Sequence, residues 1–184
     1  MSHILIVYAS HYGQTRKIAI RIAEVLRQEH HEVVLADARA TEPPPPEPYD
    51  VVVLGSRVEA GRHASEILAY IRMHREQLGT IPTAFFSVSM AAARPQAGPD
   101  PDAYLEATFH DLGWTPMCSV AFAGGLPYRS YGWFIRFLMK RISRSAGNTT
   151  DTSRNHEMTD WDAVRRFAGE LASLTRPERA VSRR

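Results

Sequence analysis

The chain has 184 residues, which is typical of one domain with a core of its own. Hydrophobic residues make up 44% and charged residues 23%, a balance that excludes wholesale disorder, and no apolar run reaches the roughly 18 to 20 residues of a membrane-spanning helix. The net charge of +2 hides an asymmetry: residues 1–125 carry 10 basic and 14 acidic side chains (−4), whereas residues 126–184 carry 12 basic and 6 acidic ones (+6).

The cysteine content and the first residues favour a cytoplasmic protein. Cys118 is the single cysteine, so no internal disulfide can form, which suits a reducing compartment. The apolar run Ile4–Ala9 is too short for a secretory signal and has the wrong flanks.

Short apolar runs predict five strands that alternate with helices. The strands are expected at His3–Tyr8, Glu32–Ala36, Val51–Gly55, Thr83–Val88 and Cys118–Ala123. Helices are expected after the first strand, with Ile18, Ala19, Ile22, Ala23 and Leu26 on one face, and over Ser65–Leu78, Asp102–Leu112 and Trp161–Leu174. The proline-rich stretch Glu42–Pro48 cannot pair in a sheet, and Asp160 is placed to cap the last helix.

This alternation predicts an α/β fold with a doubly wound, five-stranded parallel sheet of order 2-1-3-4-5. We expect one domain over residues 1–175 and a basic, disordered tail over residues 176–184. An insert of about residues 126–157 follows the fifth strand and is too long for a simple turn into the last helix.

The loop after the first strand, Ser10-His11-Tyr12-Gly13-Gln14-Thr15, runs directly into a helix. Hydroxyl groups, a glycine and the free N–H groups of a helix start can bind a phosphate. A capped helix with a polar turn explains the same residues, and the loop alone does not separate the two readings.

The loops after the third and fourth strands consist largely of small residues. These loops span Ser56–His63 and Ser87–Arg94. Exposed backbone of this kind can lie along a flat ring and form hydrogen bonds with its edges. A G-x-G-x-x-G, a P-loop and the acidic strand ends of a phospho-receiver are all missing from the sequence. A phosphate cup with two such loops favours a flavin mononucleotide (FMN). The residues predicted to bind it are Ser10, His11, Tyr12, Gly13, Gln14, Thr15, Val58, Ala60, Gly61, Ser87, Val88, Ser89, Met90, Ala91 and Ala92.

The first loop resembles that of flavodoxin-like proteins, whose pattern is [ST]-x-[ST]-G-x-[ST]. Ser10, Gly13 and Thr15 match this pattern, whereas Tyr12 stands where the family has a hydroxyl group. Within that superfamily, nearly the whole chain resembles the menaquinone-dependent protoporphyrinogen IX dehydrogenases of bacterial haem (heme) and porphyrin biosynthesis. The stretches that carry this resemblance are Gly13–Arg16, Ile18-Ala19, Tyr49–Val53, Ile81–Val88, Ala123–Tyr128, Thr150–Thr152 and Thr159–Trp161.

The resemblance implies a flavodoxin-like fold and an oxidoreductase in which FMN carries the chemistry. It implies oxidation of protoporphyrinogen to protoporphyrin, with the electrons passed to a quinone. No side chain stands out as an acid or base. The hypothetical substrate residues are Arg57, Arg62, His63, Arg94 and Arg129, the arginines because guanidinium pairs with carboxylate. An electron-carrier flavodoxin and an FMN-dependent NAD(P)H:quinone reductase remain the alternatives.

The insert contains a basic and aromatic segment, Trp133–Arg144, that can be read as a helix with one apolar face. That face could simply cover the core while the basic side chains are solvated. The segment could equally bind an anionic membrane or a partner, which would place the protein peripherally on the cytoplasmic face of the inner membrane. The residues of this hypothesis are Trp133, Arg136, Phe137, Lys140 and Arg144.

The remaining features predict no further ligand. The eight histidines show no metal-ligand spacing, and no known nucleic-acid-binding motif accompanies the arginines. The oligomeric state does not follow from the sequence.

Overall fold

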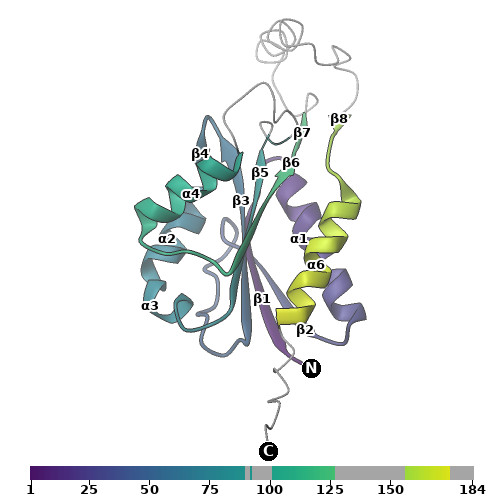
Figure 1. Cartoon of the computed structure of the whole chain (residues 1–184), viewed down its shortest axis with the longest axis vertical. Helices are drawn as coiled ribbons and strands as arrows, with labels where there is room; N and C mark the ends of the chain where they lie inside the picture. Colours follow the sequence, from purple (N-terminus) through teal and green to yellow (C-terminus); the bar gives the residue numbers. More distant parts are fainter. Residues whose placement is uncertain (90–91, 93–100, 127–155, 175–184) are drawn as a thin grey trace, which may run out of the picture.

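The computed structural model describes residues 1–89, 92, 101–126 and 156–174, which form a parallel sheet between two layers of helices (Figure 1). The strands of the main sheet are β1 (His3–Ala9), β2 (Glu32–Asp37), β3 (Val51–Glu59), β4 (Arg62–His63), β5 (Thr83–Ser89) and β6 (Cys118–Ala123). The helices are α1 (Gln14–Gln28), α2 (Ser65–Met73), α3 (Arg75–Leu78), α4 (Pro101–Leu112) and α6 (Trp161–Leu174). A separate pair of short strands is formed by β7 (Gly125–Leu126) and β8 (His156–Glu157).

Five strands run parallel in the order β2-β1-β3-β5-β6, and β4 adds to β3 in the antiparallel direction. The five parallel strands are the five that the sequence predicts, so the order 2-1-3-4-5 is confirmed. β1 is an interior strand, and its residues from Ile4 to Ala9 are buried because both faces of the sheet are covered. The predicted strand bounds agree with the structure to within one residue, except that β3 continues to Glu59.

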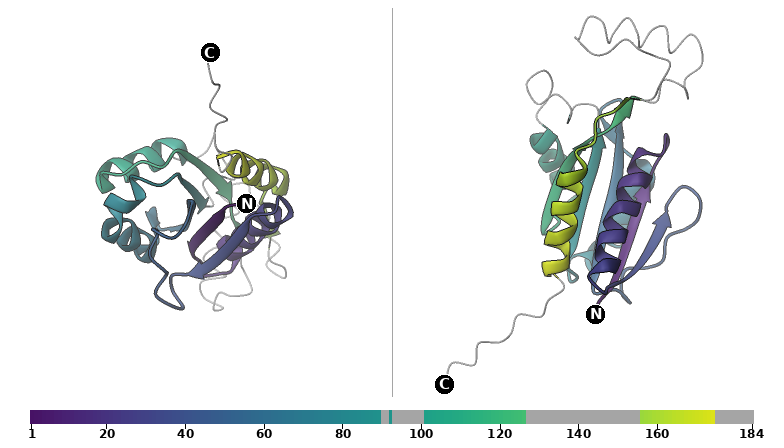
Figure 2. Two further views of the ribbon diagram at one scale, coloured as in Figure 1. Left: turned by 90° about the horizontal axis from the view of Figure 1, so that it is seen from below. Right: turned by 90° about the vertical axis from the view of Figure 1, so that its right-hand side faces the viewer.

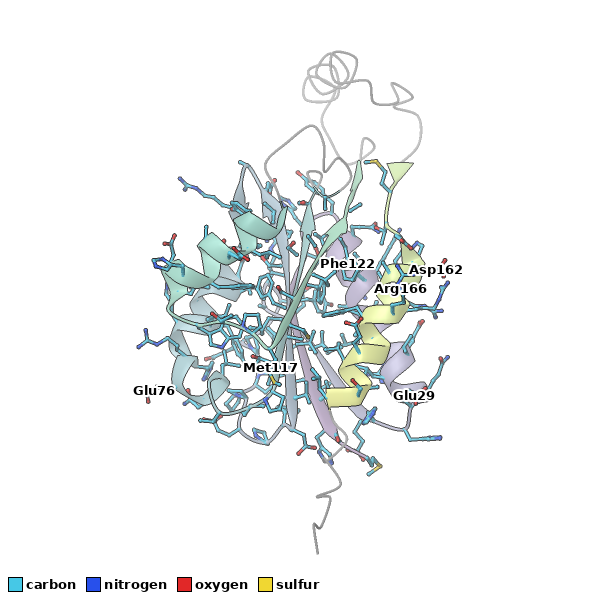
Figure 3. The ribbon with its side chains drawn as sticks, viewed as in Figure 1. Glu29, Glu76, Met117, Phe122, Asp162 and Arg166 are labelled. Carbon is cyan, nitrogen blue, oxygen red and sulfur yellow. The ribbon has the colours of Figure 1, made fainter. Side chains whose placement is uncertain are left out.

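Each face of the sheet has its own apolar core. On one face, α1 and α6 pack against residues that include Ile6, Val53 and Phe86. On the other face, α2, α3 and α4 cover residues that include Leu54 and Phe85. Figure 2 shows these two helical layers on opposite sides of the sheet, with α1 and α6 side by side. Figure 3 shows side chains filling the space between the layers, whereas Asp162 and Arg166 of α6 are exposed.

The predicted apolar face of α1 is confirmed. All five of its predicted residues are fully buried: Ile18, Ala19, Ile22, Ala23 and Leu26. Their spacing follows the 3.6-residue turn of a helix, so a single stripe of the helix faces the sheet.

The last helix begins where the sequence predicts it. The Asp160 carboxylate accepts hydrogen bonds from the N–H groups of Asp162 (2.9 Å) and Ala163 (3.0 Å). These N–H groups have no partner within the helix, so the carboxylate serves as its N-terminal cap.

The helix predicted over residues 65–78 is wrong in one respect, because the structure breaks it into α2 and α3 at His74. His74 has φ −112° and ψ 22°, outside helical values, although its N–H still bonds the Tyr70 carbonyl. Leu78 of α3 is buried in the core after this break.

The two ends of the predicted insert lie side by side. Gly125 pairs with Glu157 and Leu126 with His156 in the antiparallel β7–β8 ladder. The intervening residues 127–155 and the tail after residue 174 lie outside the described residues. The division into a single domain, an insert and a disordered tail therefore stays a prediction.

Candidate functional site

The carboxyl ends of β1, β3, β5 and β6 meet at one edge of the sheet, at the top of Figure 1. Ligands of doubly wound sheets bind beyond this edge, where the connections leave the sheet in opposite directions. The loops that the sequence singles out all begin here.

The junction of β1 and α1 forms a tight turn around Gly13. Gly13 has φ +90°, a conformation that side chains rarely adopt, and its N–H donates to the Ser10 hydroxyl at 3.1 Å. Nothing lies within 4 Å of the position that a Cβ of Gly13 would take. The turn therefore has open space beside its backbone, at the start of a helix.

The first turn of α1 has no side-chain cap, since the residue at the cap position is a glycine. N–H groups at a helix start carry a partial positive charge, so this turn attracts an anion. Thr15 is buried in the same turn, whereas His11 and Tyr12 are exposed and stack with ring centroids 4.4 Å apart.

Gln14 links this turn to a distant part of the chain. Its side-chain amide donates to the Thr159 hydroxyl at 2.8 Å, and the Thr159 hydroxyl donates to the Ala123 carbonyl at 2.7 Å. The first residue of α1 is therefore joined through Thr159 to the last residue of β6.

The predicted loop after the third strand is a β-hairpin, which corrects the expectation of an irregular segment. Val58 pairs with His63 and Glu59 with Arg62, and the two turn residues Ala60 and Gly61 have φ 49° and 72°. Positive φ at both turn positions is the signature of a type I′ turn, whose twist matches that of the strands. The backbone of Val58 is therefore paired with β4, and of this hairpin only the turn residues Ala60 and Gly61 lie outside the β-ladder.

His63 belongs to this hairpin, and its side chain points into the protein. Its side chain is buried between Phe85 (ring centroids 5.3 Å apart) and Tyr104 (5.3 Å), and neither ring nitrogen has a hydrogen-bond partner among the described residues. Burial lowers the pKa of His63 from 6.5 to about 4, so the imidazole is neutral at neutral pH. The Tyr104 hydroxyl donates to the Gly61 carbonyl and so connects α4 to the hairpin turn.

The predicted loop after the fourth strand starts later than expected. Ser87, Val88 and Ser89 are buried in β5 and pair with β6. The Ser89 hydroxyl then accepts a hydrogen bond from the Ala92 N–H at 3.1 Å. Met90, Ala91 and Arg94 lie outside the described residues, and the role of this loop in cofactor binding stays a prediction.

Ionisable side chains from four segments form a chain of contacts along the edge. The Arg39 guanidinium lies 3.4 Å from Glu66, whose other oxygen lies 3.8 Å from Arg57. Arg57 also contacts Glu59 at 3.3 Å, and Glu59 lies 3.5 Å from His11. Arg39 donates to the Ser10 carbonyl at 2.9 Å as well, so the network holds the turn between β1 and α1.

This network changes the expectation for the substrate arginines. The guanidinium of Arg57 already faces two carboxylates, whereas Arg62 is exposed on β4 near the hairpin turn. Of the two, Arg62 is therefore the better placed to meet a new carboxylate. Arg129 and the segment with Trp133, Arg136, Phe137, Lys140 and Arg144 lie outside the described residues.

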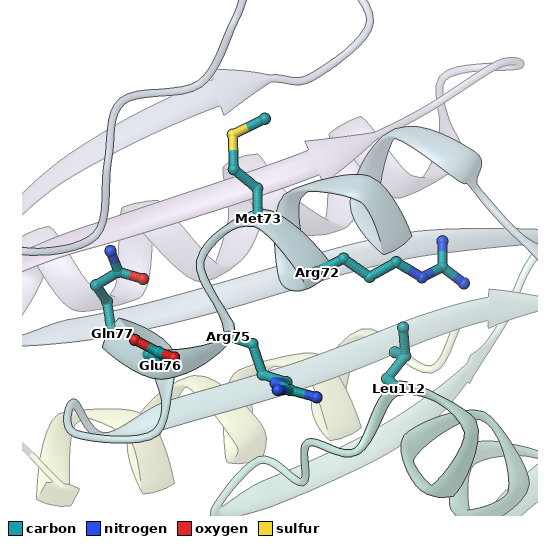
Figure 4. Close-up of a pocket in the computed structure, with 6 residues that line it drawn as sticks. All are labelled: Arg72, Met73, Arg75, Glu76, Gln77 and Leu112. Atoms are coloured by element: carbon teal, nitrogen blue, oxygen red, sulfur yellow. The ribbon is translucent and has the colours of Figure 1, made fainter.

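Of two pockets, one lies away from the strand-end site, and the other is lined in part by Arg39 and Glu66 of the charged network. One of about 530 Å³ lies beside α3 and the end of α4, lined by Arg72, Met73, Arg75, Glu76, Gln77 and Leu112 (Figure 4). Since α3 leads into the start of β5, this pocket is near the amino ends of the strands. The second, of about 390 Å³, lies between α2 and residues 38–43.

No group of three potential metal ligands occurs in the part of the chain that the structure describes. A search of the same residues finds no helix long and apolar enough to span a membrane.

The sequence does not single out Arg39, Glu66 or Tyr104, although each holds part of the edge in place. Thr159 appears in the sequence only within a stretch that carries the resemblance. Gln14 and Thr159 are 145 positions apart, so no local pattern could reveal their contact.

The family model of the flavodoxin domain matches residues 5–153. The chain belongs to the flavodoxin domain family. Its strand order agrees with this assignment, and oxidised flavodoxin 1 from Bacillus cereus is similar in fold, with a TM-score of 0.55 over 94% of this chain and 98% of that one at 17% identity.

Two relatives are more similar in sequence. A protein of Escherichia coli strain K12 named protoporphyrinogen IX dehydrogenase [quinone] is 34% identical over 93% of this chain and 95% of its own length. A protein of Leishmania major with the same name is 30% identical over 92% of this chain and 74% of its own length. This flavodoxin-domain chain and the two relatives therefore belong to one family.

Proposed function

We propose that this flavodoxin-domain protein is an FMN-dependent protoporphyrinogen IX dehydrogenase that passes electrons to a quinone. The observation that carries the proposal is the 34% identity to the Escherichia coli dehydrogenase, which extends over 93% of this chain and 95% of that one. A match of this extent spans nearly the whole of both chains and is not confined to one part of the fold.

The turn between β1 and α1 fits the phosphate of FMN. The glycine at φ +90° leaves open space beside the backbone, and the helix start behind it has no side-chain cap. Ser10 and Thr15 supply hydroxyl groups on either side of Gly13. These residues would hold the phosphate through N–H and O–H donors, without a metal ion.

The hairpin turn and the end of β5 would border the flavin ring. The Gly61 carbonyl accepts a hydrogen bond from Tyr104, and the Ser89 hydroxyl accepts one from Ala92, so a contact restrains each segment. When bound, FMN would supply two-electron redox chemistry, by which hydrogens removed from the porphyrinogen in repeated rounds reduce a quinone to a quinol. We propose that this quinone is menaquinone. The residues of this chain bind and orient the two reactants.

Arg62 is the described arginine that we assign to a carboxylate group of the substrate. We expect Arg62→Gln to raise the KM for protoporphyrinogen about tenfold, because a charge-assisted hydrogen bond contributes about 1.5 kcal/mol, and to leave kcat nearly unchanged. Steady-state kinetics with the FMN-loaded protein measure both constants. Arg72→Gln, at an exposed arginine near the end of α2, is the matched control, and an equal KM for wild type and Arg62→Gln would contradict the assignment.

The function is tested by anaerobic mixing of the FMN-loaded protein with protoporphyrinogen IX and a menaquinone analogue. We expect porphyrin fluorescence to appear faster than with the same concentration of free FMN. NADPH in place of the porphyrinogen tests the reductase alternative under the same conditions.

Each outcome separates the candidates. Oxidation of NADPH without porphyrin formation identifies a reductase. Electron exchange with another redox protein, but with neither small substrate, identifies a carrier. A protein that binds no flavin overturns the proposal as a whole.

A further inference from the structure

The hydrogen-bonded chain Gln14–Thr159–Ala123 joins three segments that the sequence keeps far apart. The Thr159 hydroxyl accepts from the Gln14 amide at 2.8 Å and donates to the Ala123 carbonyl at 2.7 Å. One hydroxyl group carries one proton, so its only donor is used on Ala123 and its direction is fixed.

The Gln14 end of this chain lies in the turn assigned to the phosphate. Gln14 is the first residue of α1 and follows Gly13, so its backbone N–H belongs to the uncapped helix start. Because the Gln14 side chain is hydrogen-bonded to Thr159, the orientation of Gln14 at the start of the helix is restricted.

The Ala123 end is anchored in the sheet. Ala123 is the last residue of β6 and pairs with Ser89 of β5, and the N–H of the next residue, Gly124, donates to the Ser89 carbonyl at 2.8 Å. The chain of hydrogen bonds therefore starts from a residue that is paired within the sheet.

Thr159 itself is held from both sides. It follows β8 by two positions, and its neighbour Asp160 caps α6 through the N–H groups of Asp162 and Ala163. A hydroxyl group on a segment fixed in this way can orient another residue instead of following it.

We propose that Thr159 is a positioning residue for the phosphate end of bound FMN. It holds Gln14, and through Gln14 the first turn of α1, in the orientation in which the N–H groups face the phosphate. The inference rests on the proposed function, because it concerns the same cofactor site. It assigns to Thr159 no contact with the flavin ring or with the substrate.

Riboflavin provides the discriminating probe, since it has the flavin ring of FMN and lacks the phosphate. A residue that positions the phosphate-binding turn affects the affinity for FMN and leaves that for riboflavin nearly unchanged. A residue that merely stabilises the fold affects both affinities alike.

The experiment compares dissociation constants for FMN and riboflavin, measured by quenching of flavin fluorescence. Thr159→Val removes the hydroxyl and keeps the shape, and we expect it to weaken FMN binding about fivefold to tenfold and riboflavin binding less than about twofold. Thr159→Ser restores the hydroxyl and should bind FMN within about twofold of wild type. Thr80→Val, which removes an exposed hydroxyl bonded to the Gln77 carbonyl, is the matched control and should change neither affinity.

Gln14→Met tests the same hydrogen bonds from the other end and also serves if Thr159→Val does not fold. It should show the same selective loss of FMN affinity, and the double variant should lose little more than either single variant. Equal losses for FMN and riboflavin, or unchanged FMN binding in Thr159→Val, overturn the inference and leave the proposed function standing. A wild-type protein that binds neither flavin overturns the proposed function and the inference with it.

Discussion

At the scale of single residues, Gly55 of β3 makes room for an aromatic ring. Gly55 pairs with Phe86 on β5, and a Cβ at Gly55 would lie 2.2 Å from Cζ of Phe86. Phe86 is fully buried and packed among other core side chains, so relieving the clash requires its neighbours to shift.

We therefore expect Gly55→Ala to lower the free energy of unfolding by about 1–3 kcal/mol through overpacking. Urea denaturation measures the change. Adding Phe86→Leu to the Gly55→Ala variant should recover part of the lost stability. Gly169→Ala in α6 is the control, because nothing lies within 4 Å of its added Cβ and alanine favours a helix. Equal stability of the two alanine variants would contradict this packing.

His63 makes stability depend on pH. Its pKa is about 4 in the folded protein against 6.5 for an ordinary histidine, so the unfolded chain takes up the proton first as the pH falls. The contribution of His63 is fully present above about pH 6.5, is lost as the pH falls toward about 4, and amounts to about 3 kcal/mol at most.

His63→Leu should flatten this part of the pH profile of unfolding, measured by urea titration between pH 4 and about pH 7. His110→Gln, which changes an exposed histidine, is the control and should keep the wild-type slope. A profile of His63→Leu that runs parallel to that of wild type would show that His63 is not buried as described.

At the scale of elements, the β3–β4 hairpin shows why local patterns miss part of the site. The sequence predicts a strand that ends at Gly55, because the polar residues after it lack an apolar alternation. The strand continues because Val58 and Glu59 find partners in β4 across a two-residue turn. The turn sequence Ala60-Gly61 is a weak signal, since Asn-Gly or Asp-Gly is the usual type I′ pair.

Ala60→Asn should therefore stabilise the protein. Ala60 has φ 49°, which costs an alanine about 1 kcal/mol, whereas asparagine tolerates this conformation. We expect a rise of about 2 °C in Tm by circular dichroism. Ala40→Asn, at an exposed position of ordinary φ, should leave Tm unchanged, and the same result for Ala60→Asn would contradict the turn geometry.

At the scale of the whole molecule, the first and last helices complete one face of the sheet together. α6 packs against α1, and Leu171 is fully buried in the core that the two helices share. The end of the described chain thus completes a core that α1, near the beginning of the chain, cannot cover alone.

Leu171→Ala should lower the free energy of unfolding by about 2–5 kcal/mol and keep a single transition by fluorescence and circular dichroism. Met73→Ala, at a side chain that is 68% exposed, should have little effect. Separate transitions for the two probes would show that α6 is not part of the same cooperative unit.

The sequence by itself determined the parallel order of the five strands, the buried face of α1 and the cap of α6. Its resemblance to flavodoxin-like proteins agrees with the flavodoxin domain family to which the chain belongs. The face of α1 and the cap of α6 follow from patterns within about ten residues, because helical periodicity is a local property. The strand order follows from the alternation of strands and helices along the chain. Only the tertiary structure decided the site's supports: the Gln14–Thr159 bond, the carboxylates around Arg57 and the buried state of His63. Each depends on which distant segments pack together, and that is settled by the layers of the fold as a whole.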